Sequence, residues 1–285
     1  DGEGTETTSG VEIRRLGAVS SAVTEWQNLR AYAPLADAFD GADVDLLHAY
    51  NMELHPAVGV LGERRDVPTV ATLNSYHFLP KRVSNTTAHG LEALYERVGY
   101  PTTGRVLRYL MSRIDRFVAL STTIRDIYAG HGLQRRRMDV IPNMYDPSFS
   151  VPETAPEYEG ITLLYVGELT EQKGVSYLLR ALARLDSRYR LRVVGDGPRR
   201  GDLESIVANL GVEDRVTFIG RVPYGEVASE YAAADVFAHP GVWPEPFSRT
   251  VVEAMQAGLP VVSTAVGGHV DVIDVDELVC PPRDP

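Results

Sequence analysis

The stretch Ile161–Leu185, ITLLYVGELTEQKGVSYLLRALARL, contains the unit from which the fold can be inferred. Its first six residues are apolar, aromatic or β-branched and are typical of a buried strand. From Val175 onward the apolar residues recur at helical spacing on one face. A turn bounded by glycines, Gly167–Gly174, joins the two segments. This succession of strand, turn and amphipathic helix predicts a parallel sheet covered by helices.

The same alternation continues on both sides of this stretch. In the first half, strands are predicted at Val11–Leu16, Val44–Ala49, Thr69–Leu73, Arg116–Leu120 and Met138–Ile141, and helices at Glu25–Phe39 and Thr122–Ala129. In the second half, strands are predicted at Ile161–Val166, Leu191–Val194, Val216–Ile219, Val236–His239 and Val261–Ser263, and helices at Arg200–Leu210, Gly225–Ala233 and Ser248–Ala257. We therefore predict an α/β fold with two Rossmann-like parallel sheets.

The two halves are separated by a segment without periodicity. Prolines and acidic residues interrupt every pattern between Asn143 and Gly160. We therefore predict an N-terminal domain over residues 1–146, a linker over 147–160 and a C-terminal domain over 161–285. Parallel sheets bind ligands at the carboxyl ends of their strands, so two such domains facing each other would form a cleft between these ends.

Composition excludes several classes of protein. The 285 residues include 44% hydrophobic and 24% charged side chains, which is typical of a soluble globular protein. The net charge of −11 argues against a nucleic-acid binder, because a phosphate backbone selects basic surfaces. A single cysteine, Cys280, excludes a disulfide scaffold and indicates the cytoplasm. The seven histidines show no metal-binding spacing, so no metal site is predicted.

Two turns after predicted strands have backbone N–H groups suited to an anion. They are Gly167–Gly174, which carries Lys173, and Gly195–Pro198. For each turn the alternative is an ordinary βα connection, with Lys173 merely exposed. The chain contains no G-x-G-x-x-G fingerprint and no Walker loop, so no dinucleotide cofactor is predicted. Lys173 is nevertheless one of only two lysines, the other being Lys81.

The stretch Trp243–Pro260, WPEPFSRTVVEAMQAGLP, places Glu245 in a loop and Glu253 inside the following helix. Ser248 is a good N-cap residue, so the amides of residues 247–249 form a candidate anion site. The two carboxylates could hold hydroxyl groups through charge-assisted hydrogen bonds. The alternative makes Glu253 a solvated helix residue and Ser248 only a cap.

The order of these elements resembles the donor-binding domain of GT-B retaining glycosyltransferases, glycosyltransferase family 4. The resemblance rests on Gly167–Gly174, Gly195–Pro198, the pair Glu245 and Glu253, and Gly267–Gly268. It is strong over Ile161–Pro285 and looser over Val44–Asn143. It implies a GT-B fold, in which the C-terminal domain binds the nucleotide-sugar donor and the N-terminal domain faces the acceptor.

The resemblance also implies roles for individual residues. Lys173 would contact the donor diphosphate, Glu245 would hold hydroxyls of the transferred sugar, and Glu253 would hold the nucleotide ribose. Lys173 and Glu245 are thus the expected catalytic residues. The other expected donor-binding residues are Gly167, Gly195, Gly197, Arg221, Phe247, Ser248, Arg249, Gly267 and Gly268. On the acceptor side the expected residues are His48, Asn74 and His77.

The implied function is that of a hexosyltransferase in carbohydrate biosynthesis. It would move a hexose-type sugar from a UDP- or GDP-sugar to a glycan, lipid or other acceptor, with retention of configuration and without a metal or cofactor. Glycolipid or polysaccharide synthesis would place it in the cytoplasm, with peripheral contact at the inner membrane face as an option. Arginines 105, 108, 113 and 116 on a predicted helix could meet anionic lipid, but we favour an ordinary amphipathic helix because the chain is acidic.

Several departures from the family's pattern keep an alternative open. Glu168 stands where the family commonly has arginine, and Arg199, Arg200 or Arg221 would have to compensate. Asn74 stands where histidine is frequent. The family's first strand with its glycine-rich turn, and its last helices, have no counterpart, so we expect an incomplete enzyme. The alternative function is a non-catalytic sugar-nucleotide-binding GT-B module.

The acceptor side has one further candidate segment. Residues 75–103 form a long insertion with the aromatic residues Tyr76, Phe78, Tyr95 and Tyr100. We expect this insertion to shape the acceptor site.

Overall fold

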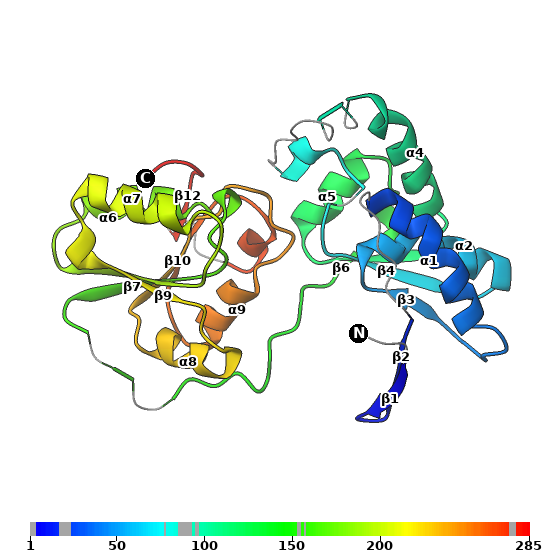
Figure 1. The fold of residues 1–285 in the computed structure, drawn as a ribbon, viewed down its shortest axis with the longest axis horizontal. Coiled ribbons are helices and arrows are strands. Elements are labelled where there is room, and N and C mark those ends of the chain that lie inside the picture. The colour runs from blue at the N-terminus through cyan, green and yellow to red at the C-terminus, as the bar shows by residue number, and fades with distance from the viewer. Residues whose placement is uncertain are drawn as a thin grey trace. The chain divides into compact units, whose positions relative to one another are not determined.

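The computed structural model describes residues 4–16, 24–76, 78–84, 93–94, 97–152, 155–156, 158–273 and 278–285. These residues form two compact units, the first made mainly of residues up to Ile141 and the second mainly of Pro142–Pro285. Each unit has its own parallel sheet (Figure 1). The prediction of an α/β fold with parallel sheets is confirmed.

The first unit is built on a sheet of four parallel strands in the order β3-β4-β5-β6. The strands are β3 (Leu47–Ala49), β4 (Thr69–Leu73), β5 (Arg116–Ala119) and β6 (Met138–Val140). The helices are α1 (Thr24–Ala38), α2 (His55–Arg65), α4 (Tyr100–Met111) and α5 (Thr122–Gly130), with short 3-10 turns at Met52–Leu54, Lys81–Ser84 and Arg135–Arg137. Leu73 and Phe117 are almost fully buried, as expected for strands covered on both faces.

A separate hairpin precedes this sheet. Strand β1 (Gly4–Thr8) pairs antiparallel with β2 (Val11–Arg15) through a turn at Ser9 and Gly10, which have φ values of 51° and 81°. The prediction that Val11–Leu16 belongs to the parallel pattern was therefore wrong. The physical reason is that every residue of β2 is exposed, so the strand is specified by a left-handed two-residue turn rather than by burial.

The second unit contains a sheet of six parallel strands in the order β12-β11-β10-β7-β8-β9. The strands are β7 (Ile161–Val166), β8 (Tyr189–Val194), β9 (Val216–Gly220), β10 (Val236–His239), β11 (Val261–Thr264) and β12 (Val279–Cys280). The helices are α6 (Val175–Arg184), α7 (Arg200–Leu210), α8 (Tyr224–Ala232) and α9 (Arg249–Gln256), with 3-10 turns at Glu171–Lys173, Glu213–Arg215 and Gly268–Asp271.

The central strand β7 serves both faces of this sheet. Leu163 and Tyr165 pack with the apolar face of α6 and α7, whereas Leu164 packs with α8 and α9. In Figure 1 these helix pairs lie on opposite sides of the sheet. Burial on both faces explains why the run that predicted this strand is continuously apolar.

The segment that follows Pro142 packs on the second unit. Phe149 and Val151 contact the core beneath α8 and α9. The Asp146 carbonyl accepts a hydrogen bond from Gln256 (3.0 Å), and its carboxylate accepts one from the Tyr224 hydroxyl (2.9 Å). Residues 146–151, here named the anchoring segment, overlap the predicted linker and are fixed to these two helices.

Within the described ranges, none of the helices combines the length and apolar character needed to cross a bilayer.

Candidate functional site

The first two βα turns of the second unit interlock at the carboxyl edge of its sheet. The Gly167 N–H donates to the carbonyl of Val194 (2.9 Å), and the Gly195 N–H donates to that of Gly220 (2.7 Å). Gly195 has a φ of 128°, and a Cβ there would overlap the carbonyl oxygen of Gly167. A Cβ on Gly197 would lie 2.6 Å from the neighbouring carbonyl oxygen of Leu169. These glycines are required because backbones approach one another closely.

The turn that carries Lys173 is fixed to the loop after β10. Gly174 ends this turn with a φ of 70°, and a Cβ there would overlap the carbonyl oxygen of Pro240. The Val242 N–H donates to the carbonyl of Gln172 (2.9 Å). This packing brings the first predicted turn beside the Trp243–Pro260 stretch.

Lys173 and Glu245 form a close ion pair across these two loops. The Lys173 Nζ lies 2.7 Å from Oε1 and 2.8 Å from Oε2 of Glu245. The two side chains are 23% and 14% exposed, so the pair is largely withdrawn from water yet reachable. The two residues predicted to be catalytic are therefore neighbours, although 72 positions separate them.

Gly267 and Gly268 support the backbone of Glu245. The Gly268 N–H donates to the Glu245 carbonyl (2.7 Å). Gly267 has a φ of 94°, and a Cβ there would lie 2.9 Å from the backbone nitrogen and oxygen of Glu245. Both glycines are buried and hold the loop in place.

Two histidines that the sequence analysis did not single out lie behind Glu245. The His239 Nε2 is 3.4 Å from Glu245 Oε2, and the rings of His239 and His269 have centroids 4.3 Å apart. Both side chains are at least 96% buried. His239 is the last residue of β10, at the edge where ligands of parallel sheets bind, and this position is the signal that could have identified it.

The contacts of Glu245 shift its pKa against the effect of burial, whereas burial itself lowers the pKa of His269. Burial alone would raise the pKa of Glu245, but the hydrogen bond from His239 and the charge of Lys173 outweigh it and lower that pKa to about 2. Burial, followed by the nearby His239, lowers the pKa of His269 to about 3, so this ring is neutral at physiological pH. Glu245 is therefore an obligate hydrogen-bond acceptor.

Glu253 is buried rather than solvated. It is 8% exposed, and its Oε2 accepts a hydrogen bond from the Tyr231 hydroxyl (2.8 Å). Burial raises its pKa. The alternative interpretation of Glu253 as a solvated helix residue was therefore wrong, because the helix face that carries it turns toward the core.

The start of α9 is only partly as expected. Ser248 occupies the N-cap position with an extended backbone, but its hydroxyl lies 3.1 Å from that of Thr250 and makes no capping bond. Among the described residues, no hydrogen-bond acceptor is found for the amides of Phe247, Ser248 and Arg249. These amides thus keep the capacity to bind an anion.

Arginines near the turns differ in their availability. The Nε of Arg199 lies 2.7 Å from Asp202, and that of Arg200 lies 2.9 Å from Glu204. Arg221 and Arg249 are exposed and make no ion pair with the other residues that the structure describes. Of the three arginines considered for offsetting the exposed Glu168, Arg221 is thus the uncommitted one.

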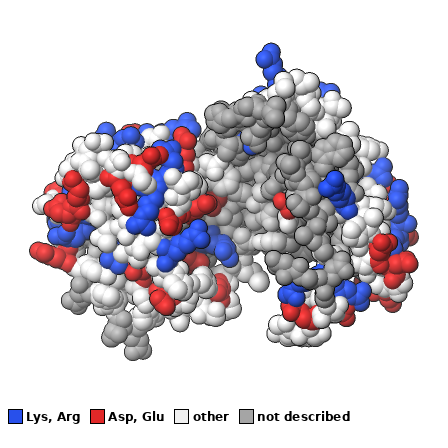
Figure 2. Space-filling view, in the orientation of Figure 1, with Lys and Arg blue, Asp and Glu red and all other residues white. Residues whose placement is uncertain are grey.

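Basic and acidic side chains are interspersed over the described surface that Figure 2 shows.

In the first unit, two of the three predicted acceptor-side residues are described. The His48 Nε2 lies 2.9 Å from the Thr72 hydroxyl, and the Asn74 side-chain amide donates to the carbonyl of Tyr50 (2.9 Å). His48 lies in β3, and Asn74 directly follows the neighbouring strand β4. His77 lies outside the described residues.

The aromatic residues of the insertion that the structure describes are buried. Tyr76, Phe78 and Tyr100 are at most 7% exposed, and the Tyr100 hydroxyl donates to the Phe78 carbonyl (2.5 Å). These rings belong to the core of the first unit, and the role of the insertion at the acceptor site stays a prediction. Tyr95 lies outside the described residues.

The arginines of α4 and the following turn are mostly committed within the first unit. Arg108 donates to the Phe78 carbonyl (3.1 Å), Arg113 pairs with Glu63, and Arg116 pairs with Asp139 (2.6 Å). This pairing favours the interpretation as an ordinary amphipathic helix.

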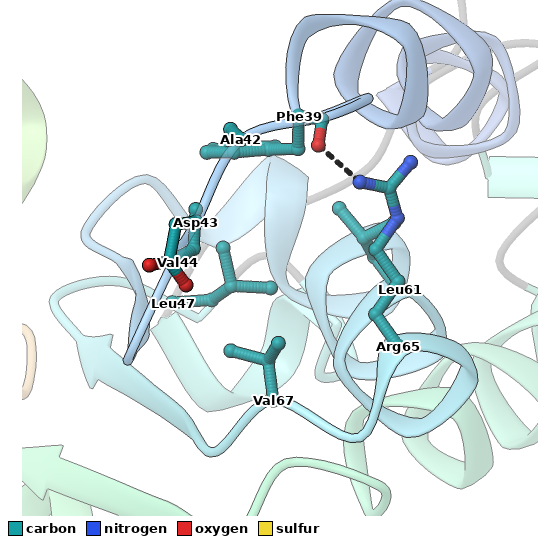
Figure 3. Close-up of a pocket in the computed structure, with 8 residues that line it drawn as sticks. All are labelled: Phe39, Ala42, Asp43, Val44, Leu47, Leu61, Arg65 and Val67. Carbon is teal, nitrogen blue, oxygen red and sulfur yellow. Dashed lines mark hydrogen bonds between the residues drawn. The ribbon is translucent and has the colours of Figure 1, made fainter.

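A pocket of about 420 Å³ opens elsewhere in the first unit (Figure 3). It is lined by Phe39, Ala42, Asp43, Val44, Leu47, Leu61, Arg65 and Val67. The Arg65 guanidinium bonds to the carbonyl of Phe39, which leaves it committed to the wall. None of the predicted site residues lines this pocket.

Comparison with known families accounts for both halves of the chain. The family described as glycosyl transferases group 1 matches residues 150–285, and the glycosyl transferase 4-like domain matches residues 1–144. The chain belongs to the group 1 glycosyltransferases. The resemblance drawn from the sequence is thereby confirmed.

Curated relatives of this group 1 glycosyltransferase include several named transferases. The 2-deoxystreptamine glucosyltransferase of Streptomyces kanamyceticus is 32% identical over 193 residues, which are 62% of this chain and 50% of the relative. The GDP-mannose-dependent alpha-mannosyltransferase of Mycolicibacterium smegmatis is 33% identical over 61% of this chain and 48% of its own length. The chain spans about half the length of these curated relatives.

Solved structures share the fold of this group 1 glycosyltransferase at low identity. The Anabaena protein HepE in complex with UDP has a TM-score of 0.74 at 22% identity, over 90% of this chain and 69% of HepE. The sucrose-phosphate synthase of Thermosynechococcus elongatus has the same TM-score and identity, over 100% of this chain and 73% of its own. The predicted GT-B fold class is confirmed.

Proposed function

We propose that the second unit binds a nucleotide-diphosphate sugar and that the protein transfers the sugar, of hexose type, to a hydroxyl acceptor with retention of configuration. The observation that carries this proposal is the Lys173–Glu245 pair, 2.7 Å apart at the carboxyl edge of the sheet. It combines a cation for a diphosphate with a carboxylate for sugar hydroxyls. The names of the relatives, which include a glucosyltransferase and a GDP-mannose-dependent mannosyltransferase, support a nucleotide-sugar donor.

The donor would exchange partners with the ion pair. Its diphosphate would take over Lys173, and its sugar hydroxyls would donate to the carboxylate that Lys173 leaves. In the ion pair with Lys173 the pKa of Glu245 is about 2, so the donor meets an ionised carboxylate that accepts hydroxyl hydrogen bonds and carries no proton to supply. Glu245 is therefore suited to holding the sugar rather than to acid catalysis.

The chemical step would depend on charge stabilisation. As the bond between the anomeric carbon and the diphosphate oxygen breaks, negative charge grows on the leaving diphosphate. Lys173 and the free amides of residues 247–249 would stabilise this charge. The exposed Arg221 and Arg249, which make no ion pair with another described residue, would be available to add to it. The oxygen of the acceptor hydroxyl would then bond to the anomeric carbon on the face that the diphosphate left, and the hydroxyl proton would pass to the departing diphosphate oxygen.

A matched pair of lysine variants tests the proposal in the full-length protein. Lys173→Ala should lower transfer at least about 100-fold, since one preorganised charge-stabilising group contributes on that scale. Lys81→Ala, which removes the chain's other lysine, should retain activity. Thermal unfolding of both variants checks that the fold is intact. Unchanged turnover in Lys173→Ala, measured by donor consumption, would remove the assignment.

A non-catalytic sugar-nucleotide-binding module is the second candidate, which the exposed Glu168 beside the Lys173 turn favours. Calorimetry and transfer assays with a panel of UDP-, GDP- and ADP-sugars separate the two candidates. Tight binding of one donor without turnover on any acceptor or water would favour the module.

A further inference from the structure

We propose that Tyr231 is a positioning residue for the ribose of the donor, because its hydroxyl holds the Glu253 carboxylate with one oxygen free for ribose hydroxyls. The inference rests on the proposed function, in which Glu253 binds the ribose. It assigns the selectivity for a ribonucleotide donor partly to a tyrosine that does not touch the donor.

The hydrogen bond between the two side chains is specific to one oxygen. The Tyr231 hydroxyl lies 2.8 Å from Oε2 of Glu253, whereas Oε1 accepts no hydrogen bond from a residue that the structure describes. Tyr231 is 0% exposed and Glu253 is 8% exposed. A carboxylate held at Oε2 therefore presents Oε1 in a fixed direction. This oxygen can accept hydrogen bonds from one or both hydroxyls of a vicinal diol.

The ring of Tyr231 is itself fixed by two aromatic neighbours. Phe149 of the anchoring segment meets it edge-on with centroids 5.6 Å apart, and Phe237 of β10 lies 5.7 Å away. These contacts place the hydroxyl 2.8 Å from Glu253 Oε2 and 3.4 Å from the Thr250 carbonyl. Its hydrogen bond to the nearer carboxylate is therefore preorganised rather than formed when the ligand arrives.

The charges around Glu253 explain why this hydrogen bond matters. Burial raises the pKa of Glu253, the hydrogen bond from Tyr231 and the charge of Arg249 lower it, and Asp146 raises it again. Tyr224 of α8 also belongs to this group of charges, because its hydroxyl bonds to the Asp146 carboxylate. Removing the Tyr231 hydroxyl withdraws a group that stabilises the ionised form, so the pKa of Glu253 should rise further.

The test compares Tyr231→Phe with Tyr224→Phe in the full-length protein, using the donor that the nucleotide-sugar panel selects and its 2′-deoxy and 3′-deoxyribose analogues. In Tyr231→Phe the donor Kd should rise roughly tenfold, as expected for one hydrogen bond to a charged group, with kcat little changed. Discrimination against the deoxyribose analogues should fall toward one, and the acid limb of kcat/KM should move to higher pH. Tyr224→Phe removes a hydroxyl of the same helix that bonds to Asp146 and not to Glu253, and it should leave the discrimination against the deoxyribose analogues unchanged.

The inference would be overturned if a folded Tyr231→Phe variant kept the wild-type discrimination against the deoxyribose analogues and the wild-type acid limb of kcat/KM. If that variant does not fold, 3-fluorotyrosine at position 231 keeps the ring and makes its hydroxyl a stronger donor. The acid limb should then move to lower pH, and an unmoved limb would overturn the inference. Failure of the proposed function is distinguishable, because the wild-type protein would then either bind no nucleotide sugar or bind one without transferring it.

Discussion

Glu245 and Glu253 show that burial alone does not decide the ionisation of a carboxylate. Both are buried in the second unit, yet the pKa of Glu245 falls to about 2 whereas that of Glu253 rises. The difference lies in their partners, since Glu245 has an ammonium group and an imidazole and Glu253 has mainly a neutral phenol. One carboxylate is a fixed charge and the other is sensitive to its surroundings.

The lowered pKa of Glu245 predicts a pH-dependent contribution to stability. Because the folded pKa lies below the unfolded value of 4.5, the contribution is fully present above about pH 5 and is lost as the pH falls from 4.5 toward 2. The free energy of urea unfolding of the wild type, relative to Glu245→Gln, should shrink by about 1 kcal/mol between neutral pH and about pH 3.5. The exposed Glu204→Gln is the control, and an equal pH slope for both variants would contradict the prediction.

The bounds of a strand could be predicted from the sequence where both faces and both edges of the strand are covered, and less accurately elsewhere. The run Ile161–Val166 was predicted with its observed bounds because β7 is central, whereas the prediction Val44–Ala49 was longer than β3, an edge strand that pairs on one side. The hairpin β1–β2 was missed because its residues are exposed.

The residues of the candidate site could be predicted in part, but the contacts between them could not. Lys173 and Glu245 could be singled out because each belongs to a local motif. Their contact with each other, and those of His239 and Tyr231 with the two glutamates, could not be predicted. These contacts join elements at least 6 and up to 72 positions apart, and a single sequence carries no signal of which distant side chains meet.

Among the helix ends, Gly174 and Gly211 allow the cost of close backbone packing to be separated from the cost of a left-handed backbone conformation. Both have positive φ values, 70° and 64°, at a helix end, but only Gly174 lies against another backbone. Gly211→Ala should cost about 1 kcal/mol of unfolding free energy for the left-handed conformation. Gly174→Ala should cost at least about 2 kcal/mol more, since the Pro240 loop must move. Equal losses on chemical denaturation would show that the overlap is relieved without cost.

At the scale of the whole molecule, the anchoring segment belongs energetically to the second unit. Phe149 and Val151 add to the core beneath α8 and α9, although they precede its first strand in the sequence. The stability of that unit should therefore depend on residues outside its sheet.

Substitution of Phe149 tests this dependence. Because Phe149 is only partly buried, Phe149→Ala should destabilise the second unit by about 2 kcal/mol, below the cost for a fully buried phenylalanine. Hydrogen exchange should accelerate in α8 and α9 and stay unchanged in α2 and β4. Met144→Ala, at a side chain 91% exposed, is the control. Faster exchange in both units, or in neither, would contradict the assignment.

The ion pair between Lys173 and Glu245 has a consequence for which molecules can enter the site. A simple anion such as orthophosphate could attract Lys173, but it would leave a buried carboxylate facing only His239, which is costly. A nucleotide sugar would replace both halves of the pair, with phosphate for the lysine and hydroxyls for the glutamate. Inhibition constants for orthophosphate, pyrophosphate and the donor would measure the difference. We therefore expect the pair to open for a molecule that carries both a phosphate and hydroxyl groups, and to stay closed to a simple anion.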